Sequence, residues 1–113
     1  MTPRTQFMDV KLALSRVGGD TELLREIAVI FMDDYPKVVA EVWDAASRGD
    51  AKAIERAAHG LKGSVANFGA PAAVDAALKL ELMGRTGELH NVSASLMELE
   101  RVLAGLHEDL VAL

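Results

Sequence analysis

The chain has 113 residues, of which 50% are apolar, 26% are charged and 4% are aromatic, and its net charge is −5. This length allows one compact core, so we expect a single domain over residues 1–113. Because the chain has no cysteine, disulfides, thiolate metal sites and cysteine nucleophiles are excluded, and its acidic balance argues against nucleic-acid binding, which needs a basic surface.

No segment has the composition of a targeting signal or of a membrane span. The uninterrupted apolar stretch of a signal peptide does not follow Arg4, and a run of about 18 apolar residues, enough to cross a bilayer, occurs nowhere. We therefore expect a cytoplasmic protein that does not insert into membranes.

Glycine and proline residues divide the chain into segments with helical periodicity. The first segment spans about residues 7–16. The second begins after Asp20, a suitable N-cap, and ends at Gly49, a residue type that readily closes a helix. Pro36 lies inside this second segment and should kink it, because proline removes a backbone hydrogen bond and crowds the preceding turn.

Two more helices are predicted on the same grounds. Asp50 can cap the third, which runs to about Phe68 and is closed by Gly69. Pro71 suits the first turn of the fourth helix, because its missing N–H has no partner there in any case. The side chains that we expect this fourth helix to turn inward are Val74, Ala77, Leu78 and Leu82.

The last segment has the most regular pattern. Apolar residues recur three or four positions apart, at Leu89, Val92, Leu96, Leu99, Leu103, Leu106, Leu110 and Leu113. Such a stripe can be a seam between two chains or a core seam within one, and four amphipathic helices joined by short loops favour the second arrangement. We therefore predict an all-α fold: an antiparallel four-helix bundle (up-down-up-down) with a short additional N-terminal helix.

The third helix carries a histidine on its polar side. On a wheel at about 100° per residue, His59 lies about 140° from Ile54, the centre of the apolar stripe. The other members of that stripe are Ala57, Ala58, Leu61, Val65 and Phe68. His59 is therefore predicted to be exposed to solvent.

Two glycines, Gly60 and Gly63, follow this histidine in the same helix, although glycine in a helix interior costs about 1 kcal/mol relative to alanine. Gly63 lies one turn beyond His59 on the same face and would leave space above the ring, while Lys62 supplies a nearby cation. This pattern indicates an accessible nucleophilic imidazole. The alternatives are an ordinary solvated histidine and glycines that permit close helix packing.

The segment from Ala57 to Ala70 closely resembles the signature of histidine-containing phosphotransfer (HPt) domains. It reads AAHGLKGSVANFGA, against a family pattern of Ala-His-x-Leu-Lys-Gly-Ser/Ala followed by Asn-x-Gly-Ala. Gly60 departs from the pattern, where the family more often has Ser, Thr or Ala, and this should affect helix stability more than chemistry. The resemblance covers nearly the whole chain, because it extends to Gly18-Gly19-Asp20 with Glu22-Leu23-Leu24, to Arg48-Gly49-Asp50 and to Leu80-Glu81.

This resemblance implies that His59 accepts a phosphoryl group from the aspartyl-phosphate of a response-regulator receiver domain and passes it to another receiver. Neutral histidine is a nucleophile near pH 7, and Lys62 and Gly63 would offset phosphoryl charge and give the partner clearance. The chain would be a phosphocarrier without intrinsic catalysis, whose partners are receiver domains, including those of a hybrid sensor histidine kinase. It would need no cofactor of its own, since magnesium is expected on the receiver.

The surface around His59 is the candidate docking surface. Lys52, Arg56 and Lys62 share this face with Glu55, so the face is locally basic although the chain is acidic. A basic face would assist encounter with the acidic rim of a receiver. The alternative is ordinary solvated helix surface.

Four further residues of the motif receive secondary roles. Ala66 continues the docking face beyond Gly63. Ser64 and Asn67 lie off that face and are expected to bond the helix end or neighbouring helices, and with Gly69 they are interpreted as local structural support.

Two other functions remain open on the residues alone. A non-catalytic interaction or dimerisation module would use the leucine stripe of the last helix, whereas we expect the phosphocarrier to be a monomer. A di-iron bundle would need Glu-x-x-His pairs, but Glu55 and His59 are four positions apart, and His90 and His107 have no such partner. We therefore expect no metal site and interpret His90 and His107 as plain surface residues.

Overall fold

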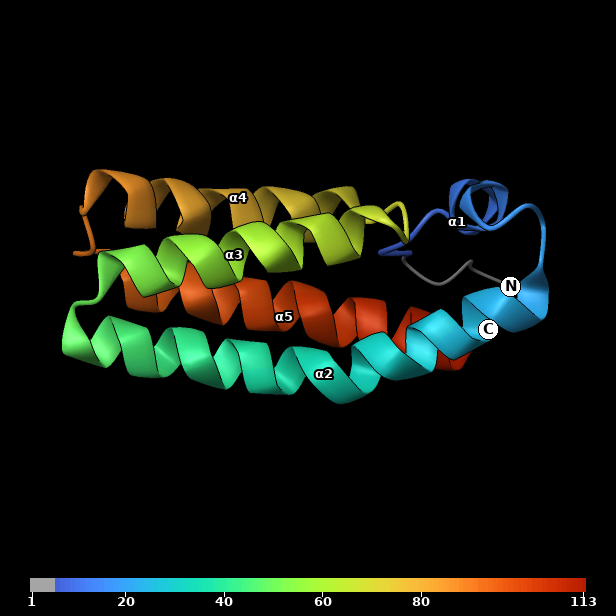
Figure 1. The fold of residues 1–113 in the computed structure, drawn as a ribbon, viewed down its shortest axis with the longest axis horizontal. Coiled ribbons are helices and arrows are strands. Elements are labelled where there is room, and N and C mark those ends of the chain that lie inside the picture. Colours follow the sequence, from blue (N-terminus) through green and yellow to red (C-terminus); the bar gives the residue numbers. More distant parts are fainter. Residues whose placement is uncertain (1–5) are drawn as a thin grey trace.

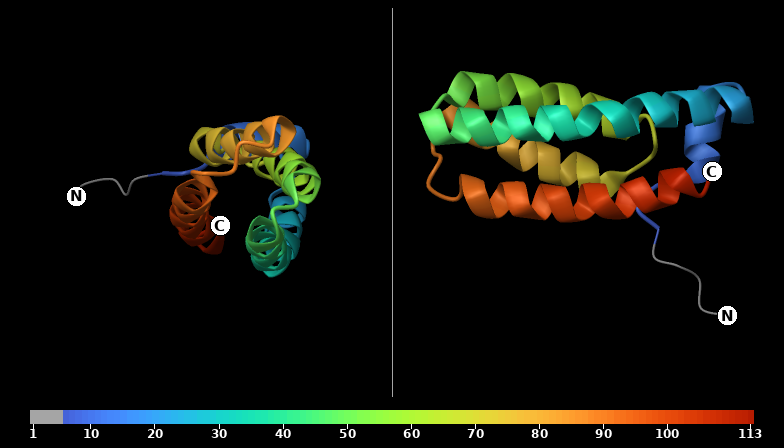
Figure 2. Two further views of the ribbon diagram at one scale, coloured as in Figure 1. Left: turned by 90° about the vertical axis from the view of Figure 1, so that its left-hand side faces the viewer. Right: turned by 90° about the horizontal axis from the view of Figure 1, so that it is seen from below.

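Five helices make up most of residues 6–113, the part of the chain that the computed structural model describes. They are α1 (Val10–Arg16), α2 (Thr21–Arg48), α3 (Ala51–Ala66), α4 (Pro71–Thr86) and α5 (Val92–Val111). Figure 1 shows α2 to α5 side by side along the longest axis, with α1 beside one end, and Figure 2 shows the same four helices end-on around a common centre. The predicted all-α four-helix bundle with a short N-terminal helix is confirmed.

No helix within residues 6–113 is both long enough and apolar enough to cross a membrane. The predicted absence of a signal peptide rests partly on Arg4, which lies outside the described residues.

Aspartate side chains fix the starts of the first three helices. Asp20 and Asp50 each accept a hydrogen bond from the backbone N–H three residues later, as expected of N-caps. Asp9 caps α1 in the same way. Because of this cap, the first helix begins at Val10 rather than at the predicted residue 7.

The remaining predicted helix ends are close to those observed. Gly49 follows α2 with a φ of 68°, the left-handed conformation that glycine adopts without strain. The helix continues through Pro36, and in Figure 1 its axis changes direction near its middle. α3 ends at Ala66, two residues before the predicted Phe68, and Pro71 occupies the first turn of α4 as predicted.

The apolar stripe of α5 faces the centre of the bundle. Its members within this helix are all buried: Val92, Leu96, Leu99, Leu103, Leu106 and Leu110. Leu99 and Leu103 are 0% and 1% exposed, so they are not available as a seam to a second chain. The stripe is the core seam of one bundle, as predicted.

The predicted inward face of α4 is correct for Ala77, which is buried, and for Val74, which is half-buried, but wrong for two leucines. Leu78 and Leu82 are 36% and 43% exposed, and the buried positions are Ala73, Ala76, Ala77, Leu80, Glu81 and Gly84. At Gly84, α4 lies so close to α3 that a Cβ would be only 2.6 Å from the backbone nitrogen of Glu55. The same close approach brings Glu81 against α3.

The segment before α1 closes one end of the bundle. A Cβ on Gly105 of α5 would clash with the ring of Phe7, so the glycine leaves the space that this ring occupies. The backbone N–H of Phe7 donates to the carboxylate of Asp109, and that of Asp9 donates to the carbonyl of Gly69 at 2.7 Å. These contacts tie the N-terminal segment to α5 and to the turn after α3.

Candidate functional site

His59 projects from α3 into solvent. Its side chain is 70% exposed, and the buried residues of the same helix are Ile54, Ala58, Leu61 and Val65, followed by Phe68. Ala57, at the edge of the predicted stripe, is half-buried. The predicted exposure of the histidine, on the opposite side of α3 from the core, is therefore confirmed.

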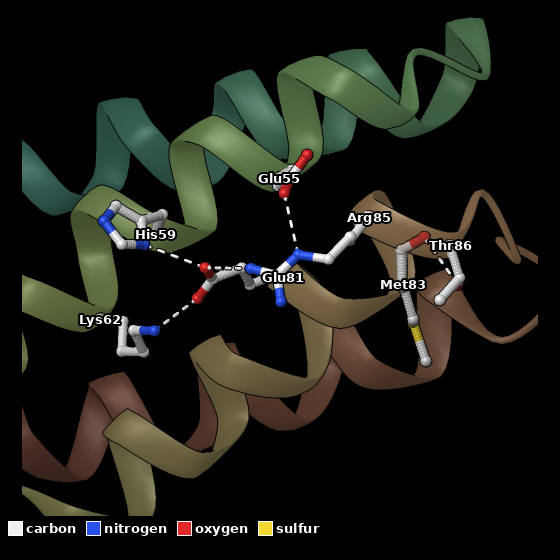
Figure 3. A network of polar contacts seen from close by, with 7 residues as sticks. All are labelled: Glu55, His59, Lys62, Glu81, Met83, Arg85 and Thr86. Atoms are coloured by element: carbon white, nitrogen blue, oxygen red, sulfur yellow. Dashed lines mark hydrogen bonds and ion pairs between the residues drawn. The ribbon is translucent and has the colours of Figure 1, made fainter.

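A buried carboxylate on α4 holds the imidazole. Nδ1 of His59 lies 2.9 Å from Oε2 of Glu81, which is 2% exposed (Figure 3). An ionised carboxylate can only accept hydrogen bonds, so Nδ1 carries the ring proton and donates it. The lone pair of the neutral ring is then on Nε2, which Figure 3 shows on the side of the ring away from Glu81.

Two cations complete the environment of Glu81. Nζ of Lys62 lies 2.7 Å from its Oε1, and Nη2 of Arg85 lies 3.0 Å from its Oε2. The hydrogen bond from Lys62, followed by that from His59, lowers the pKa of Glu81 below its ordinary value, although burial acts in the opposite direction. Glu81 is therefore ionised at neutral pH and is an acceptor only.

Arg85 also connects the site to the preceding turn of α3. Its Nε lies 3.1 Å from Oε2 of Glu55, which is one turn before His59. One guanidinium thus bridges two carboxylates, Glu55 and Glu81, from two helices. Figure 3 shows these side chains converging between α3 and α4.

Charged residues line a hollow beside the imidazole. Its volume is about 520 Å³, and it is lined by Lys52, Glu55, Arg56, His59, Glu81 and Arg85. The structure therefore brings the predicted docking residues Lys52 and Arg56 together and adds Arg85 to them. Lys62 is only 28% exposed and is paired with Glu81, so part of its charge is already neutralised.

Open space surrounds the two glycines of α3. A Cβ at Gly60 or at Gly63 would meet no atom within 4 Å, so close helix packing explains neither residue. Ala66, which continues the same face, is half-buried. Gly63 therefore leaves the surface one turn beyond His59 without side-chain obstruction.

The other motif residues lie towards the end of α3. Ser64 Oγ donates to the carbonyl of Gly60 at 3.2 Å, one turn earlier in the same helix, which is a local bond typical of serine within a helix. Asn67 is exposed and follows the last residue of α3. Gly69 has a φ of 59°, and a Cβ there would lie 2.9 Å from Cβ of Asp9, which gives it a structural role.

The sequence alone assigns no role to Glu81 or Arg85. The Leu80-Glu81 pair belongs to the family resemblance, and this is the signal that could have identified Glu81. A wheel of α3 alone cannot show which residues of another helix lie opposite His59. The close packing of α3 on α4 supplies that information.

The other two histidines differ from each other. His90 is exposed, as predicted. His107 is half-buried, and its Nδ1 lies 2.9 Å from the hydroxyl of Tyr35, so the interpretation of His107 as a plain surface residue is wrong. The sequence stripe placed it beside Leu106 but could not show that α2 covers it. Within residues 6–113, no group of three or more histidine, aspartate or glutamate side chains is placed to hold a metal ion.

Comparisons with known proteins show what this chain is similar to. The family model for the Hpt domain matches residues 26–111, which include both His59 and Glu81. The crystal structure of histidine-containing phosphotransfer protein B (HptB) from Pseudomonas aeruginosa PAO1 matches with a TM-score of 0.88 and 24% sequence identity, over 96% of this chain and 95% of that chain. No curated protein matches the chain. At this identity, the structural match shows that the two proteins share a fold.

Proposed function

Because the chain belongs to the Hpt domain family, it has a histidine phosphotransfer role in phosphorelay signalling, and we propose that His59 is the residue that carries the phosphoryl group. The observation that supports this assignment most directly is the exposed imidazole whose Nδ1 is bonded to buried Glu81. This contact orients the ring and leaves Nε2 as the nucleophile. His107 is held by Tyr35 at the equivalent nitrogen and is half-buried, so it is a poorer candidate.

In the proposed reaction, the lone pair of Nε2 attacks the phosphorus of an aspartyl-phosphate on a receiver domain. The N–P bond forms as the bond from phosphorus to the aspartate oxygen breaks, and the aspartate leaves as a carboxylate. Such transfer depends mainly on in-line positioning and charge neutralisation. We infer that the receiver supplies the magnesium ion and acidic residues, and that this chain is a phosphocarrier without intrinsic catalysis.

Lys62 and Gly63 have separate roles in this proposal. Lys62 is partly exposed and contacts the same carboxylate as the imidazole, so it can share its charge between Glu81 and the phosphoryl oxygens. Gly63 leaves the approach to the ring open. Lys52, Glu55, Arg56 and Ala66 would form the surrounding docking surface.

We further infer that residues 1–113 act as one domain, as a cytoplasmic monomer that docks with receiver domains, including those of hybrid sensor histidine kinases. The burial of Leu99 and Leu103 supports a monomer, because these residues would form the seam of a dimer. Sedimentation of the purified chain as a dimer would contradict this inference and favour the alternative, an interaction or dimerisation module.

The test of the proposed function is phosphoryl transfer from a phosphorylated receiver domain in the presence of magnesium. We expect wild-type chain to acquire an acid-labile, base-stable label, which is the stability expected of phosphohistidine, and His59→Gln to acquire none. His90→Gln is the matched control, because it makes the same change at an exposed histidine outside the site. Label retained in His59→Gln, or absent from the wild type, would contradict the assignment.

A further inference from the structure

The contact between His59 and Glu81 constrains the phosphorylated ring as well as the free one. This inference rests on the proposed function, because it concerns the state in which Nε2 carries phosphorus. Glu81 approaches the ring at Nδ1, the nitrogen that is not phosphorylated. The contact can therefore persist after transfer, provided that Nδ1 still has a proton to donate.

The chemistry of the onward transfer depends on that proton. When the receiver's carboxylate oxygen attacks phosphorus, the O–P bond forms, the N–P bond breaks, and the bonding electron pair returns to Nε2. If Nδ1 carries a proton, the ring leaves as neutral imidazole. If Nδ1 carries none, the ring leaves as an imidazolate anion, which is a much poorer leaving group.

The surroundings of Glu81 keep it an acceptor. It is 2% exposed, so water does not compete freely for its oxygens, and Lys62 and Arg85 offset its charge. The charged residues that line the hollow beside the imidazole are Lys52, Glu55 and Arg56 from α3, and Glu81 and Arg85 from α4, while Lys62 is paired with Glu81. Of these, Glu81 is the residue whose carboxylate touches Nδ1.

We propose that Glu81 is a positioning residue that keeps Nδ1 of phosphorylated His59 protonated, so that the ring leaves as neutral imidazole in the onward transfer. Glu81 thereby makes the phosphohistidine a ready donor and shortens its lifetime in water. An uncharged partner at this position would not impose the same state, because an amide can either accept from a protonated Nδ1 or donate to an unprotonated one.

The first experiment measures hydrolysis of the phosphohistidine, and its transfer to a receiver, as a function of pH in wild type and Glu81→Gln. Protonated phosphoimidazole is the reactive form, so both rates fall as pH rises through the deprotonation of Nδ1. We expect the midpoint of this fall to move to lower pH in Glu81→Gln by about one unit, which makes both rates roughly tenfold slower in mildly alkaline buffer. Loss of ring orientation alone would lower the transfer rate at every pH without moving the midpoint.

Glu98→Gln is the matched control. Glu98 lies on α5 in an ion pair with Arg101 at 2.6 Å, so this variant also replaces a salt-bridged carboxylate by an amide, but away from His59. We expect its midpoint to equal that of the wild type. Far-UV circular dichroism and the fluorescence of Trp43, the single tryptophan, verify that each variant is folded.

A second measurement uses the wild-type chain alone. In ¹⁵N-detected NMR of the phosphorylated chain, the Nδ1 resonance of His59 distinguishes a protonated nitrogen from an unprotonated one. We expect this nitrogen to remain protonated to higher pH than in a short phosphohistidine peptide. If Nδ1 of the phosphorylated wild type loses its proton at the same pH as in the peptide, Glu81 does not have the proposed role, although the proposed function stands. The same conclusion follows if the wild type and Glu81→Gln have equal midpoints. Absence of label from His59 overturns both the role of Glu81 and the proposed function.

Discussion

Gly63 determines the shape of the surface beside His59. Any side chain at this position would extend from the same face of α3 one turn beyond the imidazole. A Cβ there would meet no atom within 4 Å, so the fold itself can accommodate a larger residue. The absence of a side chain is therefore a property that a docking partner can use and that the bundle does not require.

We predict that Gly63→Gln folds normally but transfers phosphoryl groups at least about tenfold more slowly, a barrier increase of about 1.4 kcal/mol. The glutamine side chain would occupy the space through which the receiver reaches Nε2. The measurement is the transfer rate from a phosphorylated receiver, together with thermal unfolding.

Gly63→Ala separates the size of the side chain from the loss of glycine. Alanine favours the helix by about 0.5–1 kcal/mol over glycine and adds one methyl group in open space. We expect it to raise the unfolding temperature and to keep most of the transfer rate. Wild-type transfer by Gly63→Gln would show that this surface does not face the receiver.

Single residues also show how far the sequence could predict the site. His59 was identified because its position on the wheel of α3 and its surrounding motif lie in one continuous segment. Glu81 and Arg85 were not assigned, because their role arises from the contact between two helices. The sequence places Lys62 one turn from His59 in the same helix, but its pairing with Glu81 depends on that same contact between helices.

The packing of α3 on α4 is the element-scale feature that builds the site. Four of the six buried residues of α4 are alanine or glycine, and the backbones of α3 and α4 approach closely at Gly84 and Glu55. This approach sets the distance from Glu81 to His59. The fit between the two helices therefore affects both stability and the orientation of the nucleophile.

We predict that Gly84→Ala destabilises the bundle by about 1–3 kcal/mol, the usual cost of overpacking. The new Cβ would lie 2.6 Å from the backbone nitrogen of Glu55, so α4 must move away from α3. This movement weakens the hydrogen bond from His59 to Glu81, and phosphoryl transfer should slow as well. Denaturant unfolding followed by Trp43 fluorescence measures the loss, since Trp43 of α2 bonds Glu100 of α5.

Gly60→Ala is the control for this prediction. It makes the same substitution inside a helix, but its Cβ meets no atom within 4 Å. We expect Gly60→Ala to stabilise the bundle by about 0.5–1 kcal/mol through helix propensity. If Gly84→Ala were also stabilising, the close contact between α3 and α4 would not exist in solution.

The same packing explains where the sequence predicted the elements well and where it did not. The stripe of α5 was placed correctly because its large leucines all face the centre of the bundle. In α4, the spacing of apolar residues predicts Leu78 and Leu82 on the inward face, together with Val74 and Ala77. The structure turns Leu80, Glu81 and Gly84 inward instead, and hydropathy along one helix cannot reveal how close the next helix lies.

At the scale of the whole molecule, charge is distributed unevenly. The net charge of the chain is −5, yet around His59 the cations outnumber the carboxylates, with Lys52, Arg56, Lys62 and Arg85 against Glu55 and Glu81. Lys62 and Arg85 are held in ion pairs with these carboxylates. Lys52 and Arg56 are therefore the exposed charges of this face that are left to attract an acidic partner.

We predict that the double variant Lys52→Glu, Arg56→Glu slows association with a receiver by about tenfold at low salt, because electrostatic steering acts on the encounter rate. At high ionic strength the difference from the wild type should shrink, since the Debye length falls to about 3 Å at 1 M salt. Stopped-flow transfer kinetics at limiting receiver concentration measure this rate.

The control for this variant reverses a charge elsewhere on the molecule. Lys37→Glu changes an exposed lysine of α2 that is not part of the hollow beside His59. It alters the net charge in the same direction and should leave association nearly unchanged. If Lys37→Glu slowed association as much per charge as the double variant, the receiver would respond to the total charge of the chain, and the basic face around His59 would have no special part in docking.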